Sequence, residues 1–296
     1  MAWTNYHCHC DFCDGADRPL ASVQAALDRG IISLGFSSHA PLPFHRPWCI
    51  GGGFGSPTLR RYRTEIESLK KLFQGRIDIW TGLEVDYIPG LVGPSDPAFA
   101  DFDYRIGAVH FVGKTREGQP WQLDDSPEAF KRGLEELYGG DIRALVGAYY
   151  GSLAEMLRQD PPDIVAHFDL VKKYNQGSRY FDEGEAWYRD LVDTALSAVA
   201  ASGRILELNT GGMARGWIDE TYPGPWALRR CRELGIPLTL GSDSHRAADV
   251  DFGFPGAGAT LMAAGYKEIM VLNKEGWLPV RFGESGLALW ARKLAA

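Results

Sequence analysis

Short apolar segments alternate with longer segments of helical pattern along most of the chain. Proline and glycine mark the ends of the longer segments: Pro19 and Gly30 bracket one of them, and Ser126-Pro127 and Gly139 bracket another. Proline in a first turn and glycine just past a last turn are typical of helices. The apolar segments are predicted strands, at residues 4–10, 33–36, 77–83, 104–109, 163–166, 205–208 and 237–240. Strands that alternate with helices favour parallel βαβ units.

Seven such strands within about 240 residues favour a closed or nearly closed β/α barrel over an open two-domain sheet. No composition shift, Gly/Ser linker or charge run marks a domain boundary. We therefore expect one α/β domain over residues 1–296. Its motif-bearing core spans about 3–251, and residues 252–296, which carry no motif, are expected to complete it at the C-terminus.

Composition excludes several classes of protein. Lys and Arg total 31 against 38 Asp and Glu, which gives a formal charge of -7 and argues against a nucleic-acid partner. No apolar run approaches the ~18 to 20 residues of a membrane span, so no membrane partner is expected. The N-terminus lacks the basic start and apolar stretch of a secretory signal, so a cytoplasmic location is expected. Nothing in the sequence indicates an oligomeric state.

The cysteines do not suggest a disulfide framework. The chain has 5 cysteines, an odd number, in a length that does not need covalent cross-links. Cys10 and Cys13 form a C-x-x-C pair, but no second pair accompanies it. Because buried cysteine often serves as a small hydrophobe, we assign these thiols no chemical role.

The histidines lie where the predicted strands end. The chain has 7 histidines, and all but His45 lie at or just past the C-terminal end of a predicted strand: His7, His9, His39, His110, His167 and His245. The third strand ends instead in a carboxylate, Glu84. Parallel strands of a barrel present their C-terminal ends on one face, which is where the active sites of such barrels lie. We therefore expect these side chains to converge on one cavity.

Such a cluster has the chemistry of a metal centre. His7 and His9 are two residues apart, so on an extended strand both imidazoles point to the same side. A single histidine at a strand end is more often structural than a ligand, and the prediction depends on the whole set. Imidazole and carboxylate together suit Zn²⁺, Fe²⁺ or Mn²⁺. One catalytic zinc takes about three protein ligands, so a set of this size predicts two to three divalent ions.

Seven segments resemble the polymerase and histidinol phosphatase (PHP) superfamily, with the histidinol-phosphatase branch as the best match. They are NYHCHCDFCDG (5–15), GFSSHAPLP (35–43), GLEVDYIPG (82–90), IGAVH (106–110), AHFDLVKK (166–173), ELNT (207–210) and GSDSH (241–245). The motifs are specific because their order and spacing are matched together.

The resemblance implies a trinuclear metal site in a distorted (β/α)7 barrel. The ligands that match the family fall into three groups: His7, His9, Glu84 and Asp243 for the first ion, Glu84 with His110 and His167 for the second, and His39 with His245 for the third. Many family members add a histidine to the third ion from the loop after the H-x-H motif. This chain has none there, so we expect Asp14 in its place, with Asp17 or Asp11 as alternatives.

The family reaction is hydrolysis of L-histidinol phosphate to L-histidinol and phosphate in histidine biosynthesis. The resemblance implies a histidinol-phosphatase-like phosphoric monoester hydrolase whose nucleophile is a metal-bridging hydroxide, with Glu84 and Asp243 as catalytic residues. The leaving oxygen also needs a proton, from Asp243 or from a metal-bound water.

Phosphoryl transfer also needs positive charge around the phosphate oxygens. Arg215 and Lys172 follow strand ends and are the candidates for both catalysis and substrate binding, with Lys173 as a substitute for Lys172. Asn175 and Asn209 are candidates for additional hydrogen bonds.

Three other functions remain open on the sequence. The same site could act on another phosphomonoester or on a phosphodiester, since metal ligands determine the reaction and not the leaving group. An amidohydrolase also opens with H-x-H, although that class usually has eight strands and often a carboxylated lysine. A non-catalytic metal-binding module is the third, and its ligand set would be less complete.

Overall fold

The computed structural model describes residues 2–288 of the chain. Its main feature is a 7-stranded parallel sheet in the order β1-β2-β3-β4-β7-β8-β9. The strands are β1 Trp3–Asn5, β2 Ile31–Phe36, β3 Asp78–Asp86, β4 Tyr104–Ala108, β7 Ile164–Val165, β8 Ile205–Asn209 and β9 Leu238–Gly241. Each strand overlaps one of the predicted segments. The predicted seven-stranded α/β barrel is confirmed.

The two edge strands of this sheet meet and nearly close the barrel. Beyond the last residues of β1 and β9, Cys8 and Ser244 form a parallel bridge, and the His9 amide donates to the Ser244 carbonyl over 2.9 Å. Nearer to the strands themselves, the side-chain amide of Asn5 donates to Ser242 Oγ over 2.7 Å. The first strand was predicted to run to residue 10, but its regular pairing ends at Asn5. The segment that carries His7 is held by these separate contacts instead.

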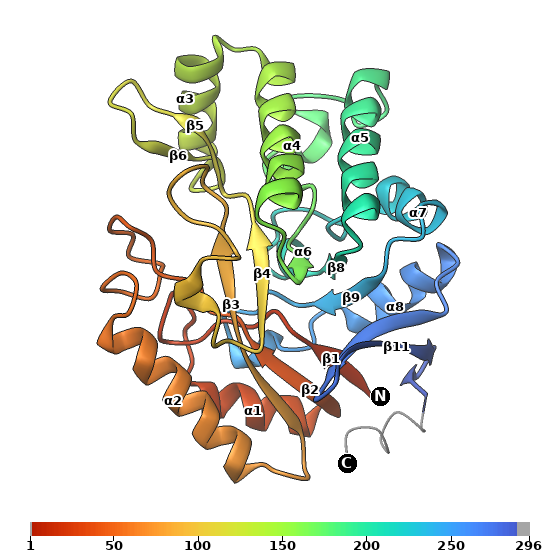
Figure 1. Cartoon of the computed structure of the whole chain (residues 1–296). Coiled ribbons are helices and arrows are strands. Elements are labelled where there is room, and N and C mark those ends of the chain that lie inside the picture. Colours follow the sequence, from red (N-terminus) through yellow and green to blue (C-terminus); the bar gives the residue numbers. More distant parts are fainter. Residues whose placement is uncertain (1, 289–296) are drawn as a thin grey trace.

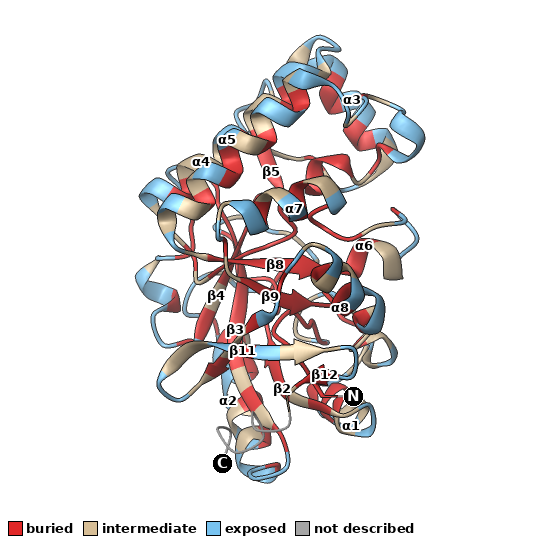
Figure 2. Cartoon of the chain, turned by 90° about the vertical axis from the view of Figure 1, so that its right-hand side faces the viewer, coloured by how far each residue is buried: buried red, intermediate tan, exposed pale blue. Residues whose placement is uncertain are grey.

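Helices on the outside of the sheet connect the strands (Figure 1). Side-chain caps start several of them: Ser56 Oγ accepts from the Leu59 amide, and Ser126 Oγ accepts from the Ala129 amide. Their outward faces are exposed while the strands are buried, as Figure 2 shows. The α-helices are α1 Pro19–Asp28, α2 Pro57–Leu72, α3 Pro127–Tyr138, α4 Ile142–Gln159, α5 Ala186–Ser202, α6 Gly211–Ala214, α7 Pro225–Glu233 and α8 Phe254–Ala263. Short 3₁₀ helices span η1 Pro97–Phe99, η2 Leu170–Lys172, η3 Gln176–Ser178 and η4 Ala247–Asp249.

Apolar and aromatic side chains fill the enclosed face of the sheet below the histidines. Tyr104, Ile106 and Ala108 alternate along β4 in step with His110, so they share its face of the strand. The Tyr104 hydroxyl donates to the Tyr6 carbonyl over 2.6 Å, across the sheet. These contacts make a rigid floor under the cavity.

The C-terminal segment closes the floor from the far end. It forms an antiparallel sheet of β10 Glu268–Asn273, β11 Gly276–Gly283 and β12 Gly286–Leu287. Trp277 of β11 packs edge-on against Tyr6 with ring centroids 4.9 Å apart, and the Leu272 amide donates to the Tyr6 hydroxyl over 2.9 Å. Part of the expected domain, Met1 and residues 289–296 of the expected C-terminal completion, lies outside the described residues.

A small hairpin follows β4 and leads back toward the cavity. It consists of β5 Phe111–Lys114 and β6 Pro120–Gln122, an antiparallel pair that precedes α3. No described helix combines the length and the apolar character that a membrane crossing would require.

Candidate metal centre

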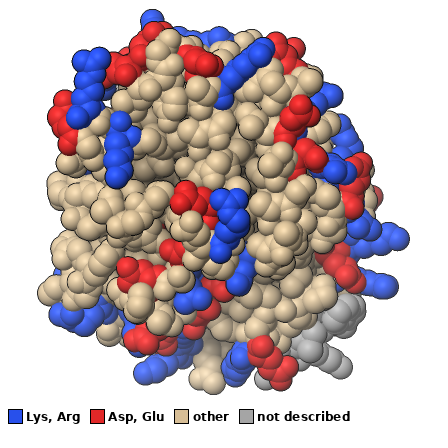
Figure 3. All heavy atoms as spheres, turned by 45° about the horizontal axis from the view of Figure 1, so that its top comes forward, with Lys and Arg blue, Asp and Glu red and all other residues tan. Residues whose placement is uncertain are grey.

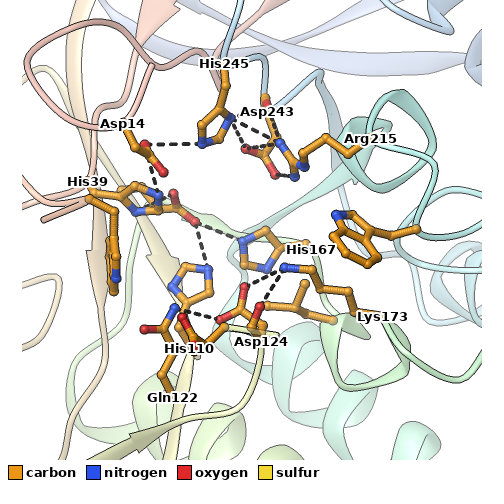
Figure 4. Close-up of a pocket in the computed structure, with 15 residues that line it drawn as sticks. Asp14, His39, His110, Gln122, Asp124, His167, Lys173, Arg215, Asp243 and His245 are labelled. Carbon is orange, nitrogen blue, oxygen red and sulfur yellow. Dashed lines mark hydrogen bonds and ion pairs between the residues drawn. The ribbon is translucent and has the colours of Figure 1, made fainter. Parts of the chain in front are cut away.

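The C-terminal ends of the barrel strands surround a cavity of about 280 Å³ (Figure 4). Both the strand ends and the loops beyond them contribute side chains to its wall. The lining residues are Asp14, His39, Trp48, Glu84, His110, Gln122, Asp124, Asp125, His167, Leu170, Lys173, Arg215, Trp217, Asp243 and His245. His7 and His9 lie beside it, fully or almost fully buried. The structure thus brings together all nine predicted metal ligands.

Glu84 stands at the centre of this group. Its Oε2 lies 3.2 Å from His7 Nε2, 3.3 Å from His9 Nε2 and 3.1 Å from His39 Nδ1. Its other oxygen, Oε1, lies 2.9 Å from His167 Nε2 and 3.6 Å from His110 Nε2. The two oxygens of one carboxylate therefore face two different sets of imidazoles, which is the arrangement that a bridging ligand requires.

A second carboxylate, Asp243, lies on the other side of the same histidines. Its Oδ1 is 3.8 Å from His7 Nε2, 3.4 Å from His9 Nε2 and 3.6 Å from His245 Nδ1. His7, His9 and Asp243 form one of three clusters whose ligand atoms lie close enough together to share an ion. A further cluster consists of His39, Glu84 and His110.

Asp14 lies where the third group was predicted. Its Oδ1 is 3.3 Å from His245 Nε2, 3.8 Å from His39 Nε2 and 3.9 Å from His9 Nδ1. These four residues form the remaining cluster. The alternatives Asp11 and Asp17 do not line the cavity, and Asp17 Oδ2 instead accepts from the Ala247 amide over 2.8 Å.

Two of the histidines have a carboxylate behind them. His7 Nδ1 lies 2.8 Å from Glu207 Oε2, and His110 Nδ1 lies 2.9 Å from Asp86 Oδ1. Such outer carboxylates orient metal-binding imidazoles and fix which nitrogen carries the proton. The sequence reasoning missed the role of both residues. Asp86 lies two residues after Glu84 in β3, so the two side chains share a face of that strand. Glu207 likewise lies two residues before Asn209 in β8. This spacing was the signal that the sequence offered.

The charges of the cluster are strongly coupled. Burial opposes charge on His7, but Glu207 and Glu84 raise its pKa to about 10. Burial likewise opposes charge on His110, whose pKa Asp86 raises to about 10. Burial lowers the pKa of His39 to about 3, despite its proximity to Glu84. The carboxylates therefore stabilise a positive charge beside His7 and His110, whether a proton or a metal cation carries it.

Unpaired nitrogen atoms test whether metal ions fit this site. Nε2 of His7, Nε2 of His9 and Nδ1 of His39 are buried and lack a hydrogen-bond partner in the structure. A buried polar atom without a partner is costly, so most native examples have an explanation. All three atoms face Glu84, and imidazole with carboxylate is a donor set for divalent transition metals. The residues present fit a cluster of such ions.

The guanidinium of Arg215 reaches the cavity from the end of α6. Its Nη2 donates to Asp243 Oδ2 over 2.7 Å, and its Nη1 donates to the Asp243 carbonyl over 2.8 Å. Burial would raise the pKa of Asp243, but Arg215 and His7 hold it well below its usual range. The backbone of Asp243 adopts a φ of 47°, a left-handed conformation that residues other than glycine rarely adopt. Arg215 helps to hold the residue in this conformation.

Lys173 contributes the second cation of the wall. Its Nζ donates to Asp124 Oδ2 over 3.1 Å and lies 5.5 Å from the centre of the Trp217 ring. Trp48 and Gln122 complete the wall beside it. The loop that contains His45 supplies Trp48, and the segment after β5 supplies Gln122, Asp124 and Asp125, whereas His45 itself is exposed.

Three residues predicted to bind substrate are placed elsewhere. Lys172 is buried, and its Nζ pairs with Asp169 at 3.0 Å, with Glu183 at 3.4 Å and with Glu220. Asn175 Oδ1 accepts from the amides of residues 180 and 181, and Asn209 Oδ1 accepts from the amide of residue 211. None of the three lines the cavity, because each side chain is occupied in holding a loop. Lys173, the substitute, is the lysine that lines it.

The outer surface gives no sign of a large charged interface on the side in view. Lysine and arginine are interspersed with aspartate and glutamate over the face that Figure 3 draws. This mixture agrees with the overall charge of -7.

Comparison with known proteins places the chain in a family. Residues 5–211 match the PHP domain family. A relative from Deinococcus radiodurans named "Probable histidinol-phosphatase" is 32% identical over 274 residues, which cover 91% of this chain and 96% of that protein. The histidinol-phosphatase of Bacillus subtilis is 32% identical over 262 residues, which cover 84% of this chain and 95% of that protein.

A solved structure supports the same placement at the level of the fold. Histidinol phosphate phosphatase from Lactococcus lactis, complexed with zinc, L-histidinol and phosphate, has a TM-score of 0.67 and 21% sequence identity. The match covers 97% of this chain and 100% of that one. The chain therefore belongs to the PHP domain family, in its histidinol-phosphatase branch.

Proposed function

We propose that the protein is a metal-dependent phosphomonoesterase that hydrolyses L-histidinol phosphate to L-histidinol and phosphate. The observation that carries the proposal is the division of five imidazoles between the two oxygens of Glu84, next to two cationic side chains. The curated relatives at 32% identity carry the name of this activity.

The nine clustered residues would hold two to three divalent ions, with Zn, Fe and Mn as candidates. When bound, such ions would stabilise the negative charge of the phosphoryl oxygens. They would also lower the pKa of a water molecule, so that it can attack phosphorus at neutral pH. In this assignment Glu84 would be shared between two ions, and Asp14 would help to hold the third. Asp14 is the most exposed of the nine, so the third ion would be the easiest to lose.

Arg215 and Lys173 would bind the phosphate oxygens that face away from the histidines. A guanidinium has five N–H donors, and Asp243 engages only part of those of Arg215. Lys173 lies on the same wall, and its ammonium group can turn from Asp124 toward an anion. Hydrogen bonds from charged donors are the strongest that phosphate accepts.

The rest of the wall suits a leaving group with a ring and a positive charge. Trp48 and Trp217 offer aromatic faces, and Asp124 and Asp125 offer carboxylates. A neighbouring groove of about 440 Å³ shares Trp48, Gln122 and Asp125 with the cavity, which leaves room for a leaving group. Histidinol carries an imidazole and an amine, and both find complementary groups there.

Asp243 is the residue assigned to proton transfer. Its pKa lies well below the usual range, so it is ionised at neutral pH and can orient the attacking water by accepting a hydrogen bond from it. The proton that the oxygen of the departing alcohol needs would then pass through this carboxyl group or through a second water molecule. Arg215, which holds Asp243 on two sides, keeps the carboxylate in position for both events.

Steady-state kinetics on a panel of substrates test the proposal. The panel contains L-histidinol phosphate, p-nitrophenyl phosphate, a phosphodiester and a lactone, with metal content measured on the same sample. We expect the highest kcat/KM for L-histidinol phosphate and at least two ions per chain. A higher kcat/KM for another phosphate ester would reassign the substrate, and turnover of the lactone alone would reassign the reaction to the amidohydrolase class.

A further inference from the structure

The histidines of the metal centre differ in what supports them from behind. Glu207 and Asp86 lie against the Nδ1 atoms of His7 and His110. His9 has no carboxylate at hydrogen-bonding distance from its Nδ1 in the described structure. The atom that lies there is the sulfur of Cys13, at 3.5 Å, which is within reach of a hydrogen bond to sulfur.

A second contact determines the direction of this hydrogen bond. Cys13 Sγ also lies 3.3 Å from the Cys10 carbonyl oxygen, which can only accept. With the thiol hydrogen on that carbonyl, the lone pairs of sulfur are left for His9, and Nδ1 of His9 would carry the hydrogen that it donates to Cys13.

This arrangement leaves the other nitrogen of His9 free for a cation. Nε2 is buried without a hydrogen-bond partner and lies 3.3 Å from Glu84 Oε2 and 3.4 Å from Asp243 Oδ1. An imidazole that is protonated at Nδ1 presents its lone pair at Nε2. The ring is therefore prepared to bind a metal ion between these two carboxylates.

We propose that Cys13 is the positioning residue of His9, and that its thiol takes the part which carboxylates play for His7 and His110. The proposal rests on the metal-binding part of the proposed function and is independent of the substrate. It agrees with the placement of His9 beside Glu84 and Asp243 that the family resemblance implies, and not with a placement beside Asp14. Asp14 Oδ1 lies 3.9 Å from His9 Nδ1, whereas it is 3.3 Å from His245 Nε2.

Nuclear magnetic resonance on the zinc-loaded protein tests the tautomer directly. Protein labelled with ¹⁵N at histidine is compared before and after His9→Asn, which identifies the His9 ring signals. We expect Nδ1 of His9 to resonate as a protonated nitrogen and Nε2 as a zinc ligand. The opposite assignment, with zinc on Nδ1, would overturn the proposal.

Two substitutions at Cys13 test its effect on the ions. In Cys13→Ala the acceptor is lost, and we expect zinc affinity to fall by about 10- to 100-fold, as is typical when an outer partner is removed. Cys13→Ser keeps a donor and an acceptor, but the shorter C–O bond sets the oxygen back from both partners, so we expect at most partial recovery. Cys231→Ala removes a buried thiol of α7 that does not line the cavity and should bind zinc as the unmodified protein does.

Zinc affinity is measured by competition with a chromogenic chelator, and circular dichroism confirms that each variant is folded. Affinity of Cys13→Ala within twofold of the unmodified protein would contradict the proposal. If a variant does not fold, the tautomer measured on the unmodified protein still decides. Because neither measurement uses histidinol phosphate, an inactive protein with the expected tautomer would refute only the proposed function.

Discussion

Arg215 holds both the side chain and the main chain of Asp243. Its two terminal nitrogens lie 2.7 Å from Oδ2 and 2.8 Å from the carbonyl oxygen of that residue. One arginine therefore stabilises Asp243 in its left-handed backbone conformation and also faces the cavity in which a phosphate would bind. Its removal should affect both functions together.

Arg215→Ala is expected to lower kcat/KM for a phosphate ester by a factor of tens to thousands. The loss of a charge-assisted contact worth about 2 to 4 kcal/mol corresponds to this range. Arg215→Lys should restore only part of the lost kcat/KM, because an ammonium group cannot bind the carboxylate and the carbonyl oxygen of Asp243 as the guanidinium does. Arg281→Ala, at an exposed arginine of β11, serves as the control. Kinetics that match the control would place Arg215 outside the reaction.

Glu84→Ala is expected to abolish turnover while the barrel remains folded. The carboxylate faces both sets of histidines, so its loss should leave fewer than two tightly bound ions per chain. Glu84→Gln keeps the size of the side chain but removes its charge, and it should lose metal in the same way. Metal analysis after dialysis and circular dichroism check the two outcomes. Near-native kcat in either variant would end the assignment of Glu84 as a bridge.

The two adjacent lysines should respond in opposite ways to the same substitution. Lys173→Met removes a cation from the cavity wall, and we expect lower kcat/KM with little change in stability. Lys172→Met leaves Asp169, Glu183 and Glu220 without their shared cation, and we expect a loss of about 3 to 5 kcal/mol in the free energy of unfolding. Urea unfolding and kinetics on both variants make the comparison. A reversal would return phosphate binding to Lys172.

The sequence was sufficient to predict the strands and the cluster because both follow from local periodicity. A parallel barrel brings its strand ends to one face, so histidines at these ends, such as His39 and His110, are brought close together. Asp14 was expected from the family resemblance, because many members place a ligand of the third ion in the loop after the H-x-H motif.

The direction of side chains in the longer loops could not be predicted. Lys172 is the last residue of η2 and Lys173 follows it, and which of them faces the cavity depends on carboxylates that other loops bring there. Asn175 and Asn209 likewise bind backbone groups that only the folded loops present to them. The packing of Trp277 against Tyr6 joins opposite ends of the chain, and no local pattern indicates it.

Glu207→Gln is expected to weaken metal binding without touching a ligand. Glu207 orients His7 through Oε2 and accepts from the His167 amide through Oε1 over 2.7 Å, so it supports two ligand-bearing segments. We expect about a 10- to 100-fold loss of zinc affinity. Gly241→Ala disturbs the same pair from the neighbouring strand, because the added methyl group would collide with Glu207 Oε2 and lie 3.1 Å from His7 Cβ. Unchanged zinc affinity in both variants would show that Glu207 is not needed to orient His7.

The stability of the metal-free protein should depend on pH through His7 and His110. Both have a pKa of about 10 in the folded chain, compared with 6.5 as the ordinary value. A group whose pKa is higher in the folded state stabilises it fully below the lower value, and this contribution disappears as pH rises through the higher one. The free energy of unfolding in the presence of a chelator should therefore fall between pH 6.5 and pH 10.

Other buried groups also titrate in this range, among them Cys8, whose pKa burial raises. The comparison with Glu207→Gln isolates the part of His7, because the variant removes the carboxylate that contributes most to raising its pKa. The variant should lose less stability than the unmodified chain over the same interval, by up to about 1.4 kcal/mol per pH unit for one proton. Parallel curves from urea unfolding would show that Glu207 does not raise the pKa of His7 in the metal-free protein.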